Sequence, residues 1–229
     1  MNYQGGNILS SEKLEVKDLI EIAGKTALSA IPIGGTLITT VWDTVKSNAI
    51  ARRYEEWKSL VEERLSKLEI TLEEIGNNES FTSCLLRTTE LAAKTSQERK
   101  REMLANALVN SLIIDIDENT MMIFLDLLST YTEIHMIILG FFQRPTNFGP
   151  VIKSNMYMGS PITLFFETYA DLKKEEDLIR IIIKELFADG LLSSESMSGM
   201  MTADGAKAKR TTEFGDKFLK FISDYKNNK

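Results

Sequence analysis

The side chains best suited to nucleophilic or metal chemistry occur once each in this chain, as Cys84 and His135. His135 lies in the apolar segment TEIHMIILGFF with no second histidine to complete a metal site, so we expect a packed or partly exposed structural role. Cys84 lies in FTSCLL, where Arg87 is the only basic neighbour able to activate a thiol, and we expect a core residue. A single cysteine also excludes an intrachain disulfide and is typical of a reducing cytoplasm.

Two kinds of loop resemble ligand-binding motifs without completing them. Asp115, Asp117 and Asn119 are spaced like the first ligands of a calcium loop, and Asp126 stands at the twelfth position. The sixth position is Thr120 instead of the glycine that the sharp turn requires, which argues against calcium. The Gly-Gly pairs in GGN and IGGT lack the Lys-Ser/Thr of a phosphate-binding loop. We therefore predict a protein without a cofactor, a metal or an enzymatic activity.

The composition is that of a helical globular protein. The 229 residues are 43% hydrophobic and 26% charged, and they include only 4 prolines and 13 glycines. These proportions exclude a wholly disordered chain and disfavour an all-β fold, which needs many turns. The net charge of −6 argues against non-specific coating of nucleic acid, because phosphate binding needs a basic field.

The start of the sequence has no basic segment followed by an apolar one, as a secretory signal would. The longest uncharged run, residues 26–42, has 17 residues and contains Pro32 and two glycines. A membrane span needs about 20 mostly apolar residues, so a helix end followed by a Pro-Gly elbow is the favoured interpretation. A membrane-active segment is the minor alternative. We therefore predict a cytoplasmic protein and disfavour membrane contact.

A long helix is predicted over residues 36–75, because no proline or glycine interrupts them. Its second part carries apolar residues at intervals of three and four, a near-heptad stripe that needs a partner helix along its length. The partner is either another helix of the same chain or a second copy in a dimeric coiled coil. This candidate helix-partner interface consists of Ile50, Tyr54, Trp57, Val61, Leu65, Leu68 and Leu72.

The predicted fold is all-α with a small β-hairpin. We divide the chain into a disordered start (1–11), a helical domain that contains the long helix (12–129) and a winged-helix domain (130–229). The winged helix is predicted from the order of elements after residue 130, which is three helices, a hairpin and a last helix.

Local signals mark the elements of this second domain. Ser160-Pro161 predicts the start of its second helix and Gly190 the end of its third. Asp204-Gly205 predicts the turn of the hairpin, and Thr212 the cap of the last helix.

A winged helix often reads DNA with its third helix, which then needs Arg, Lys, Asn or Gln. Residues 175–192 instead carry two basic residues against five carboxylates and contain no amide side chain. Residues 205–229 are more basic, with seven Lys or Arg against three Asp or Glu. We therefore expect weak DNA binding and favour protein contact. The candidate nucleic-acid contacts are Lys207, Lys209 and Arg210 of the wing with Arg180 and Lys184 of the third helix.

The stretch from Ser96 to Phe142 resembles the central region of uncharacterised bacterial proteins grouped as abortive-infection alpha-type. The similar positions are Arg101-Glu102, Ala105-Asn106-Ala107-Leu108, the acidic Asp115 and Asp117, and Ile138-Leu139. Tyr131-Thr132-Glu133 stands where that family has Leu-Ser-Pro, so one step of the motif differs. The resemblance implies a cytoplasmic protein of a bacterium or mobile element with a role near phage defence, and it carries over no catalytic residue.

These observations favour a non-enzymatic interaction protein that acts through helical surfaces, on a protein partner or by self-association. The alternative is a winged-helix DNA-binding transcriptional regulator. A membrane-active defence effector comes third.

Overall fold

The structure is a computed structural model that describes residues 21, 39–68, 75, 78–147, 158–224 and 226. The expected disordered start (1–11), residues 26–38 of the uncharged run and Leu72 lie outside these residues. Most described residues are helical and two short strands form an antiparallel sheet, so the all-α expectation is confirmed.

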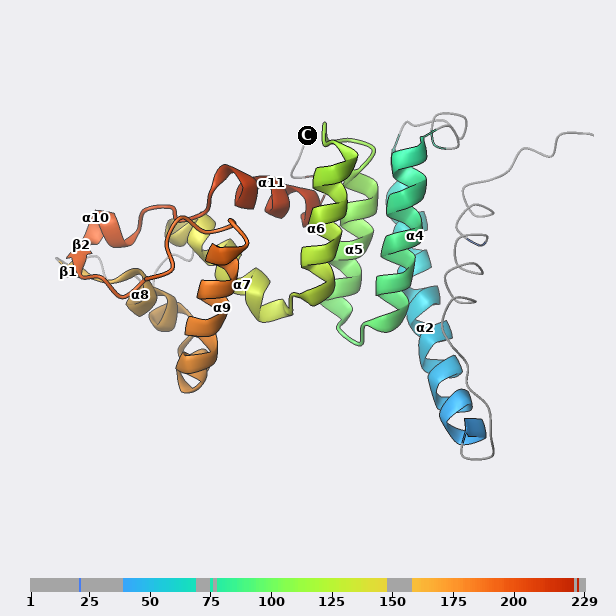
Figure 1. Cartoon of the computed structure of the whole chain (residues 1–229), viewed down its shortest axis with the longest axis horizontal. Coiled ribbons are helices and arrows are strands. Elements are labelled where there is room, and N and C mark those ends of the chain that lie inside the picture. The colour runs from blue at the N-terminus through green and yellow to red at the C-terminus, as the bar shows by residue number, and fades with distance from the viewer. Residues whose placement is uncertain are drawn as a thin grey trace, which may run out of the picture.

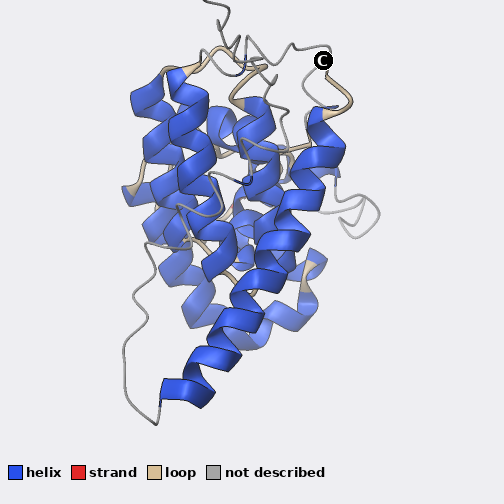
Figure 2. Cartoon of the chain, turned by 90° about the vertical axis from the view of Figure 1, so that its right-hand side faces the viewer, coloured by secondary structure: helices blue, strands red, loops and turns tan. Residues whose placement is uncertain are grey.

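Four helices from the first half of the chain lie side by side (Figures 1 and 2). They are α2 (Thr39–Leu65), α4 (Glu79–Lys94), α5 (Glu98–Asn110) and α6 (Glu118–Thr130). Helices α4 and α6 begin at side-chain caps, where Asn78 accepts from the Phe81 N–H at 2.9 Å and Asp117 accepts from the Thr120 N–H at 3.0 Å.

The helix expected over 36–75 ends earlier, at Leu65. The next residues form a tight turn in which the Leu68 N–H donates to the Leu65 carbonyl at 3.0 Å. Ser66 supplies a physical reason, because its hydroxyl donates to the Glu63 carbonyl at 2.9 Å and so competes with the regular helical pattern.

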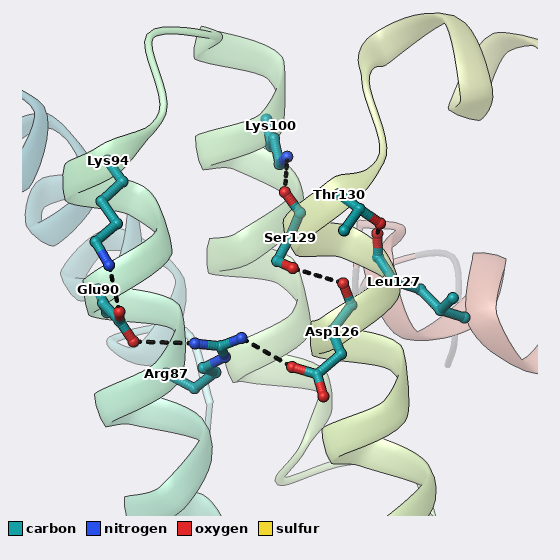
Figure 3. A network of polar contacts seen from close by, with 8 residues as sticks. All are labelled: Arg87, Glu90, Lys94, Lys100, Asp126, Leu127, Ser129 and Thr130. Carbon is teal, nitrogen blue, oxygen red and sulfur yellow. Dashed lines mark hydrogen bonds and ion pairs between the residues drawn. The ribbon is translucent and has the colours of Figure 1, made fainter.

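Polar side chains tie α6 to its two neighbours (Figure 3). The Arg87 guanidinium of α4 donates to Glu90 at 3.0 Å and to Asp126 of α6 at 2.8 Å. The Lys100 ammonium of α5 donates to the Ser129 and Tyr131 carbonyls, each at 2.8 Å. Lys100 thereby satisfies carbonyls at the end of α6 that have no partner within the helix.

The second half of the chain consists mostly of shorter elements (Figure 1). In order these are α7 (Glu133–Gln143), β1 (Met158–Gly159), α8 (Pro161–Thr168), the 3-10 helix η2 (Ala170–Glu175), α9 (Glu176–Ala188), β2 (Met201–Thr202), α10 (Ala203–Ala206) and α11 (Glu213–Ile222). The expected caps are confirmed for α8, where Ser160 accepts from Thr163 N–H, and for α11, where Thr212 accepts from Gly215 N–H.

The small sheet is present, but the predicted hairpin is wrong. Strand β1 pairs with β2, which is more than forty residues away in sequence, with Met158 opposite Thr202 and Gly159 opposite Met201. The residues expected to form the turn, Asp204-Gly205, lie in helix α10, because the Thr202 hydroxyl caps that helix and accepts from the Gly205 N–H. The two predicted arms pair as strands at one position only, the antiparallel bridge of Leu192 with Thr211.

Helix α11 packs against the first-half helices α5 and α6 and so crosses the boundary that we place at residue 130. The buried Phe124 ring of α6 contacts the rings of Phe214, Phe218 and Phe221, with centroids 4.9, 5.3 and 5.7 Å away. One contiguous hydrophobic core therefore joins residues on both sides of that boundary.

Two asparagines of α5 hold the end of α11. The fully buried Asn110 amide donates to the carbonyls of Lys220, Phe221 and Ser223 at 3.2, 2.8 and 2.8 Å. Asn106, one turn earlier, donates to the Ile222 carbonyl at 3.1 Å. These bonds supply donors for the last carbonyls of α11, which the helix itself leaves unsatisfied.

Candidate protein-binding groove between α7 and α9

Helix α9 has a buried apolar face and, in addition, apolar side chains that are exposed to solvent. Its inner face is buried and consists of Ile179, Ile182, Ile183 and Leu186. The side chains of Leu178 and Ile181, one turn apart on another face, are 42% and 55% exposed. Phe187 is 40% exposed. Isolated exposed aliphatic residues are ordinary, but two at helical spacing beside a hollow indicate a contact surface.

The C-terminal end of α9 is well defined. At its end, Gly190 has a φ of 76°, as expected for a glycine that terminates a helix. The Leu191 N–H donates back to the Leu186 carbonyl at 2.9 Å, and Gly190 N–H to the Phe187 carbonyl at 2.9 Å. Gly190 therefore ends the third helix as the sequence predicts.

A hollow of about 410 Å³ lies between α9 and the start of α7, and we call it the α7–α9 groove. Leu178 and Ile181 supply part of its apolar lining, together with Ile134 of α7. The full lining is Gln97, Thr132, Glu133, Ile134, His135, Leu178, Ile181, Ile182 and Glu185. The charged groups of this lining are therefore the carboxylates Glu133 and Glu185, and it contains no lysine or arginine.

His135 connects α7 to α9 across the groove. Its Nδ1 accepts from the Thr132 N–H at 3.1 Å, which leaves the ring proton on Nε2. Nε2 lies 3.1 Å from Glu185 Oε2 and donates to it. The ring thus holds the Glu185 carboxylate at the groove edge, while the Glu185 side chain is still 55% exposed.

Tyr131, the residue that follows α6, makes a second link to the end of α9. Its hydroxyl donates to Asp189 at 2.5 Å, and its ring stacks on His135 with centroids 4.7 Å apart. Burial, followed by the hydrogen bond and charge of Asp189, raises the pKa of the Tyr131 hydroxyl. The phenol therefore stays protonated and keeps α9 fixed to the end of α6.

A second hollow, of about 350 Å³, adjoins the groove where α4, α5 and α6 meet, and the two share Gln97 and Thr132 in their linings. Its cations already have protein partners. Lys94 pairs with Glu90 at 2.5 Å, and Lys100 donates to two carbonyls, with its pKa lowered by burial. The Gln97 side-chain oxygen, where the hollows meet, is buried and has no hydrogen-bond partner among the described residues.

Three of the five candidate nucleic-acid contacts line two different hollows. Arg180 donates to Glu176 at 2.5 Å and to Ser198 at 2.6 Å, and with the exposed Lys184 it lines a hollow of about 330 Å³. Lys209 lines a different hollow, of about 770 Å³.

The cations of the expected wing are partly engaged within the chain. Lys209 pairs with Asp216, and Arg210 donates to the Gly205 carbonyl at 2.7 Å. Burial opposes ionisation of Asp216, but hydrogen bonds from Lys209, Thr211 and Gln143 together lower its pKa. Lys207 is half-buried and has no partner among the described residues.

The apolar stripe of the long helix packs within the chain. Tyr54, Trp57, Val61 and Leu65 are buried, and α2 contacts both α4 and α5. Ile50 and Leu68 are half-buried. The buried part of the stripe has its partner in the same chain, and a contact of Ile50 with a second copy stays a prediction.

Cys84 is fully buried, and burial raises the pKa of its thiol to about 12. It therefore belongs to the core, as expected, and His135 is a packed histidine with a structural hydrogen bond at each nitrogen.

Sequence reasoning missed Leu178 and Ile181. The segment EEDLIRIIIKELF contains apolar residues on more faces of the helix than one packed side can cover, and this excess was the available signal.

Within the described part of the chain, no cluster of three or more His, Cys, Asp or Glu side chains could hold a metal ion. No described helix is both long enough and apolar enough to cross a membrane. Comparison of the chain with family models, curated proteins and solved structures gives no match in any of the three.

Proposed function

We propose that this protein is not an enzyme and acts by binding another protein through the α7–α9 groove. The observation that carries the proposal is the pair Leu178 and Ile181, exposed one turn apart on a helix whose buried face already has its partners. Withdrawing both side chains from water would favour association by roughly 1–2 kcal/mol each.

We further propose that the second half of the chain is a variant of the winged helix. The order α7, β1, α8, α9, β2 and the bridge between Leu192 and Thr211 support this arrangement. Helix α9 would then occupy the place of the recognition helix. It offers exposed aliphatic side chains and more carboxylates than cations, which suits a protein surface better than the phosphate-lined major groove.

DNA binding is the second candidate, supported by the basic segment 205–229. We expect micromolar or weaker affinity at physiological salt, in the range of non-specific binding. Replacing Lys207, Lys209 and Arg210 by Ala should abolish it and flatten its salt dependence. Nanomolar, sequence-selective binding that survives this change would place DNA recognition first, with Arg180 and Lys184 as the next residues to replace.

The cellular setting is proposed from the resemblance alone. Similarity to abortive-infection alpha-type proteins supports a cytoplasmic role near phage defence, in a bacterium or a mobile element. In that setting a binding protein without catalytic groups would act by recognising another component of the defence.

Site-specific photocrosslinking in the producing cells tests the proposed function. A photoreactive amino acid at position 181 should yield a defined protein adduct. The same residue at position 217, an exposed lysine of α11 outside the groove, should not. Equal adducts from both positions, or none from position 181, would contradict the proposal.

A further inference from the structure

We infer that the occupant of the α7–α9 groove is an amphipathic helix of the partner protein whose polar side carries Lys or Arg. The inference rests on the proposed function and adds the chemistry of the partner. It follows from three properties of the groove as the described residues form it: its apolar lining, two carboxylates without a lysine or arginine partner, and a buried acceptor without a donor at one end.

The apolar lining fits a helix. Leu178 and Ile181 are spaced by three residues and therefore form a short ridge along α9, with Ile134 on the other side of the groove. Apolar residues of a partner helix at similar spacing would lie against this ridge, as in other complexes in which an amphipathic helix occupies a groove.

The charge of the groove selects the polar side of the partner. Glu133 and Glu185 lie in the lining, and neither forms an ion pair with a lysine or arginine among the described residues. Glu185 is held by the His135 Nε2–H, so one carboxylate oxygen keeps a defined position. A Lys or Arg of the partner would meet two carboxylates, whereas a carboxylate there would be repelled.

The neighbouring hollow does not reverse this preference. Its two cations are occupied, Lys94 by Glu90 and Lys100 by the Ser129 and Tyr131 carbonyls. Between the hollows, the buried Gln97 oxygen has no donor in the part of the chain that the structure describes. A buried acceptor without a partner is costly, and an N–H donor from a basic side chain of the partner would satisfy it.

Two synthetic peptides of about 18 residues, long enough for helix formation, serve as probes. Both have the same Leu and Ala positions on one face, and their polar positions are all Lys in one and all Glu in the other. Fluorescence anisotropy should show at least tenfold tighter binding of the Lys peptide by the wild-type chain, a ratio that corresponds to about 1.4 kcal/mol.

Charge reversal in the groove should reverse this preference. In the variant Glu133→Lys/Glu185→Lys, the Glu peptide should become the tighter ligand. The matched control, Glu55→Lys/Glu102→Lys, changes two exposed carboxylates of α2 and α5 outside the groove lining and should keep the wild-type preference. Because new lysines could disturb folding, Glu133→Gln/Glu185→Gln is measured as well and should lower the ratio toward one.

Each outcome decides the inference. Equal affinity for the two peptides, or a preference that the groove variants leave unchanged, overturns it. Self-association of the chain through this groove, seen as a mass increase that Glu133→Lys/Glu185→Lys abolishes, also overturns it in favour of a second copy. If the peptide preference is absent while the crosslink from position 181 persists, the proposed function stands and only the basic helix is rejected.

Discussion

Helices α5 and α9 have the same length, 13 residues, but they use their side chains in opposite ways. In α5 every residue from Leu104 to Asn110 is buried, and the polar ones hold other elements in place. In α9 only four residues are buried, and aliphatic side chains face outward. The buried asparagines of α5 therefore serve the fold, whereas the exposed aliphatic side chains of α9 are available for binding.

The same contrast explains why the resemblance of α5 to abortive-infection alpha-type proteins does not identify a ligand-binding residue. Asn106 lies in the Ala-Asn-Ala-Leu segment, yet its side chain is buried and its amide donates to the Ile222 carbonyl at the end of α11. By contrast, the Ile181 side chain is 55% exposed, and its exposure is not explained by packing within the described fold. Function is therefore to be tested on α9 and stability on the junction of α5, α6 and α11.

The largest effect is expected at the centre of that junction. Phe124→Ala removes a fully buried ring that contacts three phenylalanines of α11, so the free energy of unfolding should fall by about 4 kcal/mol. Urea unfolding of the variant and the wild type measures this difference in the free energy of unfolding. The adjacent Ile123 is 50% exposed, and Ile123→Ala should cost less than about 1 kcal/mol. Similar losses for both variants would show that the junction is not packed as described.

A smaller loss is expected from Asn110→Ala. The two N–H groups of the amide are shared among three carbonyls at the end of α11, and at about 1 kcal/mol for each N–H their removal should destabilise the chain by about 2 kcal/mol. Asn119→Ala, at an exposed position of α6, is the matched control and should change stability by less than about 0.5 kcal/mol. Hydrogen exchange should show faster opening of α11 in the first variant only.

A still smaller and pH-dependent effect is expected at Asp216, whose pKa is lowered in the folded state. Its ionised form therefore stabilises the fold above the unfolded-state pKa, and this contribution is lost as the pH falls through the folded-state pKa. Asp216→Asn should cost about 1 kcal/mol at neutral pH, and this cost should disappear once the pH has fallen below the folded-state pKa. A difference from wild type that is independent of pH would contradict the role given to Lys209 and Thr211.

Local sequence signals predicted the helix ends well where one side chain determines the cap. Ser160, Thr212 and Gly190 act at the expected positions because each controls one turn of backbone without help from distant residues. The burial of Trp57 and Cys84 followed from apolar spacing in the same way.

Features that depend on distant residues could not be read from the sequence. The pairing of β1 with β2 joins segments far apart in the chain, and the Asp204-Gly205 signal was outweighed by the Thr202 cap. The groove likewise forms only when Glu133 of α7 and Glu185 of α9 are brought together. The excess of apolar residues in α9 was a signal that sequence reasoning missed, and it does not show which residues would lie beside α9.

The central claim is that the outer face of α9 serves binding and not folding. It is tested most directly by placing the photoreactive amino acid at position 178 and measuring the protein adduct with and without Ile181→Ser. We predict loss of the adduct and a free energy of unfolding within about 0.5 kcal/mol of the parent, because Ile181 is 55% exposed. Phe187→Ser, on α9 but outside the groove lining, should keep the adduct. An adduct that survives Ile181→Ser, or a loss of stability above about 2 kcal/mol, would contradict the claim.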